Sequence, residues 1–187
     1  AQGQAHAVTG VDRWRLLPGP SRLPDAAAPD VRGRSYRIVA TVLLGDTDVG
    51  VLVAHGDPHS GYALRIDGGA LVHHYVHAAC HTTVRYDGPL PTGAWVELGV
   101  QVDRIGLGAT VHLMVEGIAV ASGEIPLLAR ARTGYTGLDV GCDRGMTVAG
   151  YPGPARFTGR LRHIVVTAAD DQWLDEAAIL ELEGATG

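Results

Sequence analysis

The chain has 187 residues, 46% hydrophobic and 19% charged, so it is long enough for one well-buried core and short for two domains. All fifteen basic residues are arginine, the net charge is −5, and the sequence has no basic cluster, which excludes the usual signature of a nucleic-acid-binding protein. No apolar stretch reaches membrane-spanning length and no charged-then-apolar leader opens the chain, so we expect no membrane partner and favour a cytoplasmic location.

High glycine and proline content with few aromatics favours many short strands joined by tight turns. Residues 1–10 are small and polar and are expected to form a linker or a frayed start, and residues 11–187 a single domain. Apolar, β-rich runs separated by glycine and proline predict the strands. They are expected within residues 11–17, 36–44, 49–55, 62–66, 71–77, 82–86, 96–102, 111–115, 118–123, 139–145 and 157–167.

The connections and the end of the chain complete this prediction. Asp67-Gly68-Gly69 is a strong hairpin signal, because a short connection needs positive φ and glycine supplies it. Residues 172–183 contain strong helix formers with acids in the first turn, so we expect a helix there. The pattern predicts an all-β fold, a two-sheet antiparallel sandwich or jelly roll with a short C-terminal helix.

Several short motifs follow one another along the chain and together cover most of it, although no single motif is specific. They are residues 33–36, 50–56, 61–64, 67–68, 89–93, 139–145 and 157–161, together with Tyr75. In this order they resemble the C-terminal domain of the large bacterial arylsulfatases. That family belongs with the concanavalin A-like and laminin G-like β-sandwiches.

The resemblance implies a non-catalytic accessory domain that serves domain packing, substrate access or oligomerisation. Its partners would be the catalytic sulfatase-like domain of the same parent chain or a second copy. The sulfatase reaction itself does not carry over, because residues 80–85 lack the proline and the spacing of that family's Cys-x-Pro-x-Arg motif. We therefore expect this chain not to be an enzyme.

A second hypothesis is a self-standing, lectin-like carbohydrate-binding module. Five polar or aromatic side chains of the predicted strands could share one sheet face and hold a glycan by stacking and hydrogen bonds. The same face could instead pack on the parent enzyme or on a second copy. The candidate residues are Tyr62, His73, Tyr75, His77 and Arg85.

Two acidic residues are candidate metal ligands. Asp139 and Asp143 flank Gly141, and sandwiches of this class often bind calcium through loop carboxylates. The alternative is a turn in which Asp143 accepts backbone N–H bonds. The histidines at 73, 74, 77 and 81 could bind zinc, but their spacing fixes no third ligand. We expect no cofactor other than, at most, calcium.

A catalytic function has less support in the sequence. A glycan-active enzyme is the third hypothesis. No spacing places two carboxylates across one cleft, and no Gly-x-Ser-x-Gly motif occurs. Cys80 and His81 are adjacent, so in a strand their side chains point to opposite faces. With only two cysteines, we expect two small buried thiols, and one Cys80–Cys142 bridge is the alternative.

Overall fold

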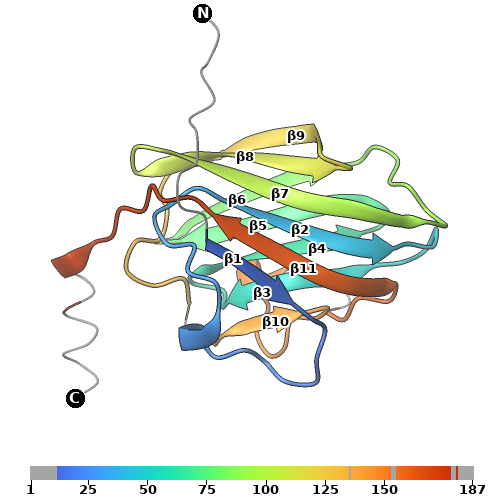
Figure 1. Ribbon diagram of the computed structural model, residues 1–187, viewed down its shortest axis with the longest axis horizontal. Helices are drawn as coiled ribbons and strands as arrows, with labels where there is room; N and C mark the ends of the chain where they lie inside the picture. Colours follow the sequence, from blue (N-terminus) through green and yellow to red (C-terminus); the bar gives the residue numbers. More distant parts are fainter. Residues whose placement is uncertain (1–11, 135, 153–154, 178–179, 181–187) are drawn as a thin grey trace, which may run out of the picture.

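The computed structural model describes residues 12–134, 136–152, 155–177 and 180, which form an all-β sandwich of two antiparallel sheets (Figure 1). No helix among these residues is long and apolar enough to span a membrane. Two short 3-10 turns, η1 (Asp25–Ala27) and η2 (Val148–Gly150), lie outside the sheets. The strands are β1 (Asp12–Leu16), β2 (Tyr36–Leu43), β3 (Gly50–Gly56), β4 (Gly61–Asp67), β5 (Ala70–His77), β6 (Cys80–Tyr86), β7 (Trp95–Ile105), β8 (Gly108–Val115), β9 (Ile118–Ile125), β10 (Leu138–Val140) and β11 (Arg160–Ala168).

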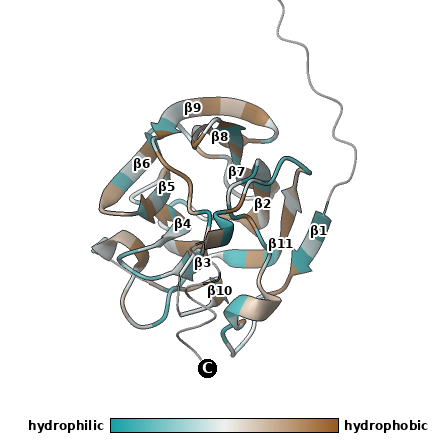
Figure 2. Cartoon of the chain, turned by 90° about the vertical axis from the view of Figure 1, so that its left-hand side faces the viewer, coloured by the Kyte–Doolittle hydropathy of each residue, from teal (hydrophilic) through white to brown (hydrophobic). Residues whose placement is uncertain are grey.

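The two sheets have six and five strands. Their orders are β1-β11-β2-β7-β8-β9 and β10-β3-β4-β5-β6. Viewed end-on, the sheets curve around a shared interior (Figure 2). The edge strands β6 and β9 meet where Thr82 Oγ1 donates to the carbonyl of Glu124 at 3.1 Å. The last strand, β11, inserts between β1 and β2, so the first and last strands of the chain lie side by side in one sheet.

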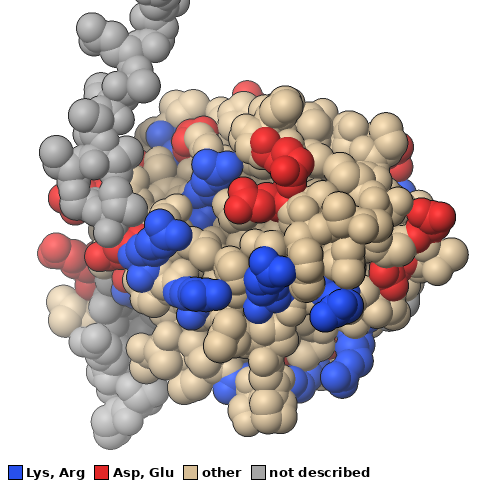
Figure 3. All heavy atoms as spheres, turned by 45° about the vertical axis from the view of Figure 1, so that its right-hand side comes forward, with Lys and Arg blue, Asp and Glu red and all other residues tan. Residues whose placement is uncertain are grey.

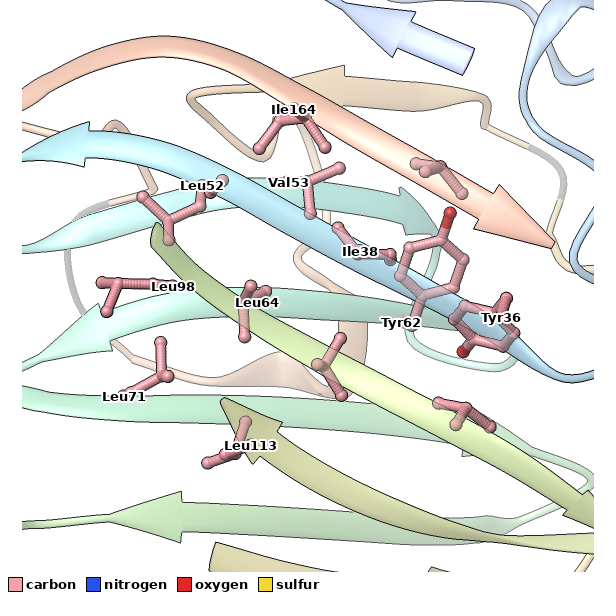
Figure 4. Close-up of a cluster of buried hydrophobic side chains, with 14 of the residues drawn as sticks. Tyr36, Ile38, Leu52, Val53, Tyr62, Leu64, Leu71, Leu98, Leu113 and Ile164 are labelled. Atoms are coloured by element: carbon pink, nitrogen blue, oxygen red, sulfur yellow. The ribbon is translucent and has the colours of Figure 1, made fainter. Parts of the chain in front are cut away.

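The core fills the space between the sheets. In β2 every second residue is buried, because the period of two sends alternate side chains to the interior. Figure 4 shows these side chains from both layers meeting in one cluster. Its fully buried members include Ile38, Leu52, Leu64, Leu71, Leu98, Leu113 and Ile164.

Three strands of the five-stranded sheet are covered on both faces, since β3 and β4 and almost all of β5 are buried along their length. The second cover comes from residues 141–152 and 155–157, and it places Val148 and Tyr151 on the outer face against Val51 and Val76. Gly50 allows this segment to pass close to β3. Its φ is +109°, and a Cβ there would lie 2.1 Å from the Arg156 carbonyl oxygen.

The predicted strands and the sandwich architecture are confirmed. Residues 1–10 and most of the predicted helix lie outside the described residues. Within 172–183, residues 176, 177 and 180 are helical and 172–175 are not. The expectation of two buried thiols is wrong for Cys80, which is exposed at the β5–β6 turn, whereas Cys142 is half-buried and both are free.

One core residue predicts a pH dependence of stability. His73 is fully buried, and neither ring nitrogen has a hydrogen-bond partner among the described residues. Burial, with a smaller effect of His74, lowers the pKa of His73 from 6.5 to about 3. Between these values the unfolded state binds more protons than the folded state, so stability falls as pH falls, by up to about 1.4 kcal/mol per pH unit.

We therefore expect His73→Leu to stabilise the fold by about 1 kcal/mol at pH 7.5, because it removes an unpaired buried polar group. The gain should grow as pH falls from 6.5 to 4. Urea unfolding at several pH values measures this. His59→Leu, at a side chain that is 87% exposed, is the control and should keep the wild-type pH dependence. An equally steep loss in His73→Leu would contradict the assignment.

Candidate functional site

The five residues predicted to share a glycan-binding face do not form one accessible surface. Tyr62, His73 and Tyr75 point inward and are 0%, 0% and 5% exposed, and His77 is half-buried at the strand end. Arg85 is exposed on the outer face of β6. The expectation of a common face is wrong, because the inner faces of β4 and β5 pack against the other sheet. A ligand at the surface cannot reach Tyr62 or His73.

The polar groups of Tyr75 and Arg85 are bonded to other groups of the protein. The Tyr75 hydroxyl accepts a hydrogen bond from the Ala129 backbone N–H at 2.9 Å. Arg85 donates to Asp67 and Asp87 at 2.8 and 2.7 Å. These contacts indicate that Tyr75 fixes the segment beside β5 and that Arg85 joins an exposed ion-pair cluster.

Asp139 is the centre of a buried ionic contact. Its carboxylate is 2% exposed and accepts from Arg22 at 2.9 Å and from Arg144 at 2.6 Å. The backbone N–H of Arg144 also donates to it at 2.9 Å. Arg144 in turn donates to the Gly19 carbonyl at 3.0 Å. Asp139 therefore ties the segment after β1 to the segment after β10.

Asp143 holds the cover over the five-stranded sheet. Its carboxylate accepts from the Tyr151 hydroxyl and, at 3.0 Å, from the Val148 backbone N–H. Burial raises the pKa of Asp143, and the Tyr151 hydrogen bond partly opposes that shift. Tyr151 stacks on His74 with 5.0 Å between ring centroids, and the Arg65 guanidinium lies 4.6 Å from the Tyr151 centroid.

These contacts do not fit the expected calcium site. The oxygens of Asp139 and Asp143 already accept from guanidinium, amide and hydroxyl donors, which a calcium ion would have to displace. Across the described residues, no three His, Cys, Asp or Glu side chains are grouped as a metal site would require. The turn interpretation of Asp143 matches the structure better.

A polar row on the six-stranded sheet superficially resembles a catalytic triad. His112 Nδ1 lies 2.7 Å from Ser122 Oγ, and its Nε2 lies 3.8 Å from Asp103. The second distance is too long for a hydrogen bond, and Asp103 instead accepts from Gln101 at 3.0 Å. The row lies on an open sheet face, so we interpret it as a cross-strand polar ladder.

A surface pocket lies where the segment after β1 meets the segments flanking β10 and β11. Its cavity volume is about 590 Å³, which is within the usual range for small-molecule sites. The hollow combines apolar side chains, peptide groups of a glycine-rich loop and two arginines. Its lining residues are Pro18, Gly19, Pro20, Val140, Gly141, Cys142, Arg144, Arg156, Phe157, Gly159 and Leu161.

Backbone hydrogen bonds fix the walls of this pocket. Gly141 donates to the Leu52 carbonyl at 2.8 Å, and Phe157 donates to the Gly141 carbonyl at 3.0 Å. The Arg144 bond to Gly19 holds the opposite wall, which includes Pro18 and Pro20. The pocket is therefore built from loops that are tied to the sandwich.

Arg156 is the chemically available cation of this pocket. Its side chain is exposed, and within the described part of the chain its guanidinium has no hydrogen-bond or ion-pair partner. The backbone of Arg156 is held by a parallel bridge to Val51. A guanidinium on a fixed backbone can bind a carboxylate or sulfate in two-pronged geometry. Sequence reasoning missed Arg156 because it lies in a loop with no recognisable motif.

Neither a scan against protein-family models nor a search of curated proteins found a match. Solved structures do match. The CBM40 module of the Ruminococcus gnavus IT-sialidase bound to α2,3-sialyllactose aligns with a TM-score of 0.55 at 13% identity, covering 84% of each chain. The same module bound to α2,6-sialyllactose gives 0.53 at 12% identity, covering 93% of this chain and 98% of that chain.

Domains LG4-5 of the mouse laminin α1 chain align with a TM-score of 0.58 at 16% identity, covering 88% of this chain. The aligned region is 44% of that two-domain chain. These similarities confirm the expected two-sheet jelly-roll sandwich fold. None of these neighbours is an arylsulfatase domain, so that part of the resemblance rests on the sequence motifs alone.

The ionic contact at Asp139 predicts a large effect of a small change. We expect Asp139→Asn to lower the free energy of unfolding by about 2–4 kcal/mol, because it leaves two guanidinium groups without their buried carboxylate. Urea unfolding at pH 7 measures the loss. Asp87→Asn is the matched control, since Asp87 pairs with Arg85 but is 72% exposed, and it should cost less than about 1 kcal/mol. Equal losses would contradict the proposed importance of Asp139.

Proposed function

We propose that this chain is a non-catalytic, lectin-like module that binds an acidic sugar in the pocket beside Arg156. The observation that carries the proposal is the unpaired Arg156 guanidinium at a hollow of about 590 Å³. The other arginine in the lining of this pocket, Arg144, is already bound to Asp139. A carboxylate or sulfate ester on the ligand would supply the partner that Arg156 lacks.

The pocket lining suggests how a sugar would be held. Pro18, Pro20 and Leu161 offer apolar surface to the C–H face of a sugar ring, while the peptide groups of Gly19 and Gly141 offer polar partners for hydroxyl groups. Arg144 keeps the two walls in place, because its guanidinium is shared between Asp139 and the Gly19 carbonyl. Arg156 would therefore select for charge, and the walls would select for shape.

Similarity of fold adds support. The CBM40 structures contain sialyllactose, whose sialic acid carries a carboxylate. Sequence identity of 12–13% shows only that the scaffold is shared, so the choice of ligand rests on the Arg156 pocket. We expect an acidic sugar to bind in this pocket without calcium.

The accessory role beside a sulfatase-like catalytic domain remains a separate prediction from the sequence motifs. A glycan-binding module could serve such a domain by holding the substrate near it. A second copy could also be the partner. The binding proposal does not depend on either arrangement, because every residue of the pocket belongs to this chain.

Isothermal titration calorimetry tests the pocket with α2,3-sialyllactose, α2,6-sialyllactose and neutral lactose, each with and without calcium. We expect at least one sialylated sugar to bind and lactose to bind much more weakly. Arg156→Ala should weaken binding by roughly 10- to 100-fold, the value of one charge-assisted, two-pronged contact. Arg156→Lys should recover only part of the affinity, because lysine keeps the charge without the planar fork.

Arg85→Ala is the matched control, since it removes an exposed arginine from β6, at the edge of the five-stranded sheet that lies opposite β10. It should leave sugar binding unchanged. If neither sialylated sugar binds, a wider glycan array of uronic acid and sulfated sugars follows. Absence of any acidic sugar from the array hits, or binding that Arg156→Ala leaves intact, would overturn the pocket assignment.

A further inference from the structure

Arginines from the two ends of the chain meet on the outer face of the six-stranded sheet. Arg13 and Arg15 of β1 pair in register with Thr167 and Val165 of β11, whose side chains point away from the core. Arg160, at the start of β11, lies in the same cross-strand row as Leu43 and Trp95. Figure 3 shows basic side chains in a row across one face of the molecule, with acidic side chains above the row and near both of its ends.

A β-bulge adds a further exposed arginine to this face. The register between β11 and β2 shifts between Leu161 and His163, so Arg162 is the extra residue of the bulge. A bulge changes the direction of side chains locally. Here it lets Arg162 lie over the ring of Trp95, with 4.1 Å between its Cζ and the ring centroid. Arg13, Arg15, Arg160 and Arg162 are all exposed, and we call them the arginine row.

The arginine row is not neutralised by the protein. Within the described residues, none of its four members forms an ion pair with an aspartate or glutamate. In contrast, Arg32 pairs with Asp30 at 2.8 Å. The chain has 20 acidic and 15 basic residues, so acids are not scarce. Four unpaired cations on one face therefore form a local positive surface on an acidic protein.

Trp95 orders two members of the row. The Cζ atoms of Arg160 and Arg162 lie 5.5 and 4.1 Å from its ring centroid, which is cation–π distance. A guanidinium resting on a ring keeps its in-plane N–H donors available. The two arginines therefore lose less side-chain entropy when they bind an anion than two unrestrained arginine side chains would lose.

His163 reports the positive potential of this surface. It lies 3.3 Å from Arg15 Nη2 and 3.3 Å from Thr41 Oγ1. Desolvation, Arg15 and Arg162 together lower its pKa, and Glu97 of β7 opposes them. Arg15 and Arg162, which come from two strands, therefore both lie close to this one imidazole.

We propose that the arginine row binds a linear sulfated polysaccharide. Sulfate esters match guanidinium donors, and a thin, extended polyanion can follow a single row of cations. A broad polyanionic surface fits less well, because Glu97 and Asp103 of β7 lie on the same sheet face and the chain carries a net charge of −5. This surface is additional to the Arg156 pocket and shares no residue with it.

Heparin affinity chromatography in a sodium chloride gradient tests the row. The full chain should be retained, and Arg15→Gln/Arg162→Gln should elute at clearly lower salt, with affinity for a heparin oligosaccharide reduced by about tenfold or more in titrations. The matched control is Arg32→Gln/Arg85→Gln, which removes the same charge from arginines already paired with carboxylates. This control should elute close to the wild type.

Two further measurements distinguish heparin binding by the arginine row from sugar binding in the Arg156 pocket. Arg156→Ala should bind heparin nearly as well as the wild type, so loss of the pocket and loss of the row are distinguishable. Nuclear magnetic resonance should show that heparin oligosaccharide raises the pKa of His163, since bound sulfate favours the protonated imidazole. His59, exposed and distant in sequence, provides the reference imidazole signal.

Three results would overturn the proposal. The first is that the Arg15/Arg162 variant and the wild type elute at the same salt concentration. The second is that the Arg32/Arg85 control loses as much affinity, since binding would then follow net charge alone. The third is tighter binding of single-stranded DNA or of anionic phospholipid vesicles than of heparin at equal salt, which would assign the row to a nucleic acid or a membrane surface.

Discussion

The antiparallel insertion of β11 between β1 and β2 is the contact on which the rest of the molecule depends. It completes the core, because Ile164 and Val166 of β11 are fully buried between the sheets. It also closes the six-stranded sheet with residues from both ends of the chain. The loop before β11 then has to pass beside the segment that follows β1, and this meeting forms the Arg156 pocket. The insertion of β11 therefore accounts both for the closed core and for the position of the Arg156 pocket.

Charge in this protein is divided between neutralised and unpaired arginines. Arg22 and Arg144 share the buried Asp139, and their role is to hold loops together. Such contacts are costly to break but add no binding capacity, because their donors are occupied. Arg156 and the arginine row have no acidic partner among the described residues, although acids outnumber bases in the chain. The distinction between structural and available cations therefore comes from pairing, which net charge does not reveal.

The sequence predicted the strands well because a period of two and glycine turns are local signals. It failed for the binding face because alternation separates two faces without saying which one is covered. Tyr62 and His73 alternate correctly with their neighbours, yet they face the second sheet. The absence of a basic cluster in the sequence was also misleading, since Arg15 and Arg162 are far apart in the chain and come close to the same imidazole, that of His163, only through the β1–β11 pairing. Non-local pairing of this kind leaves no trace in a short window.

The pocket and the arginine row are neighbours, yet strand geometry makes them separate sites. Gly159 and Leu161 line the pocket, whereas Arg160 between them belongs to the row. Successive side chains of a strand point to opposite faces, so the two surfaces open in different directions from the same few residues. One sugar cannot contact both across the strand, but a long chain could bind the row while a short acidic sugar occupies the pocket. The start of β11 thus contributes residues to both proposed binding surfaces, and substitutions on one need not affect the other.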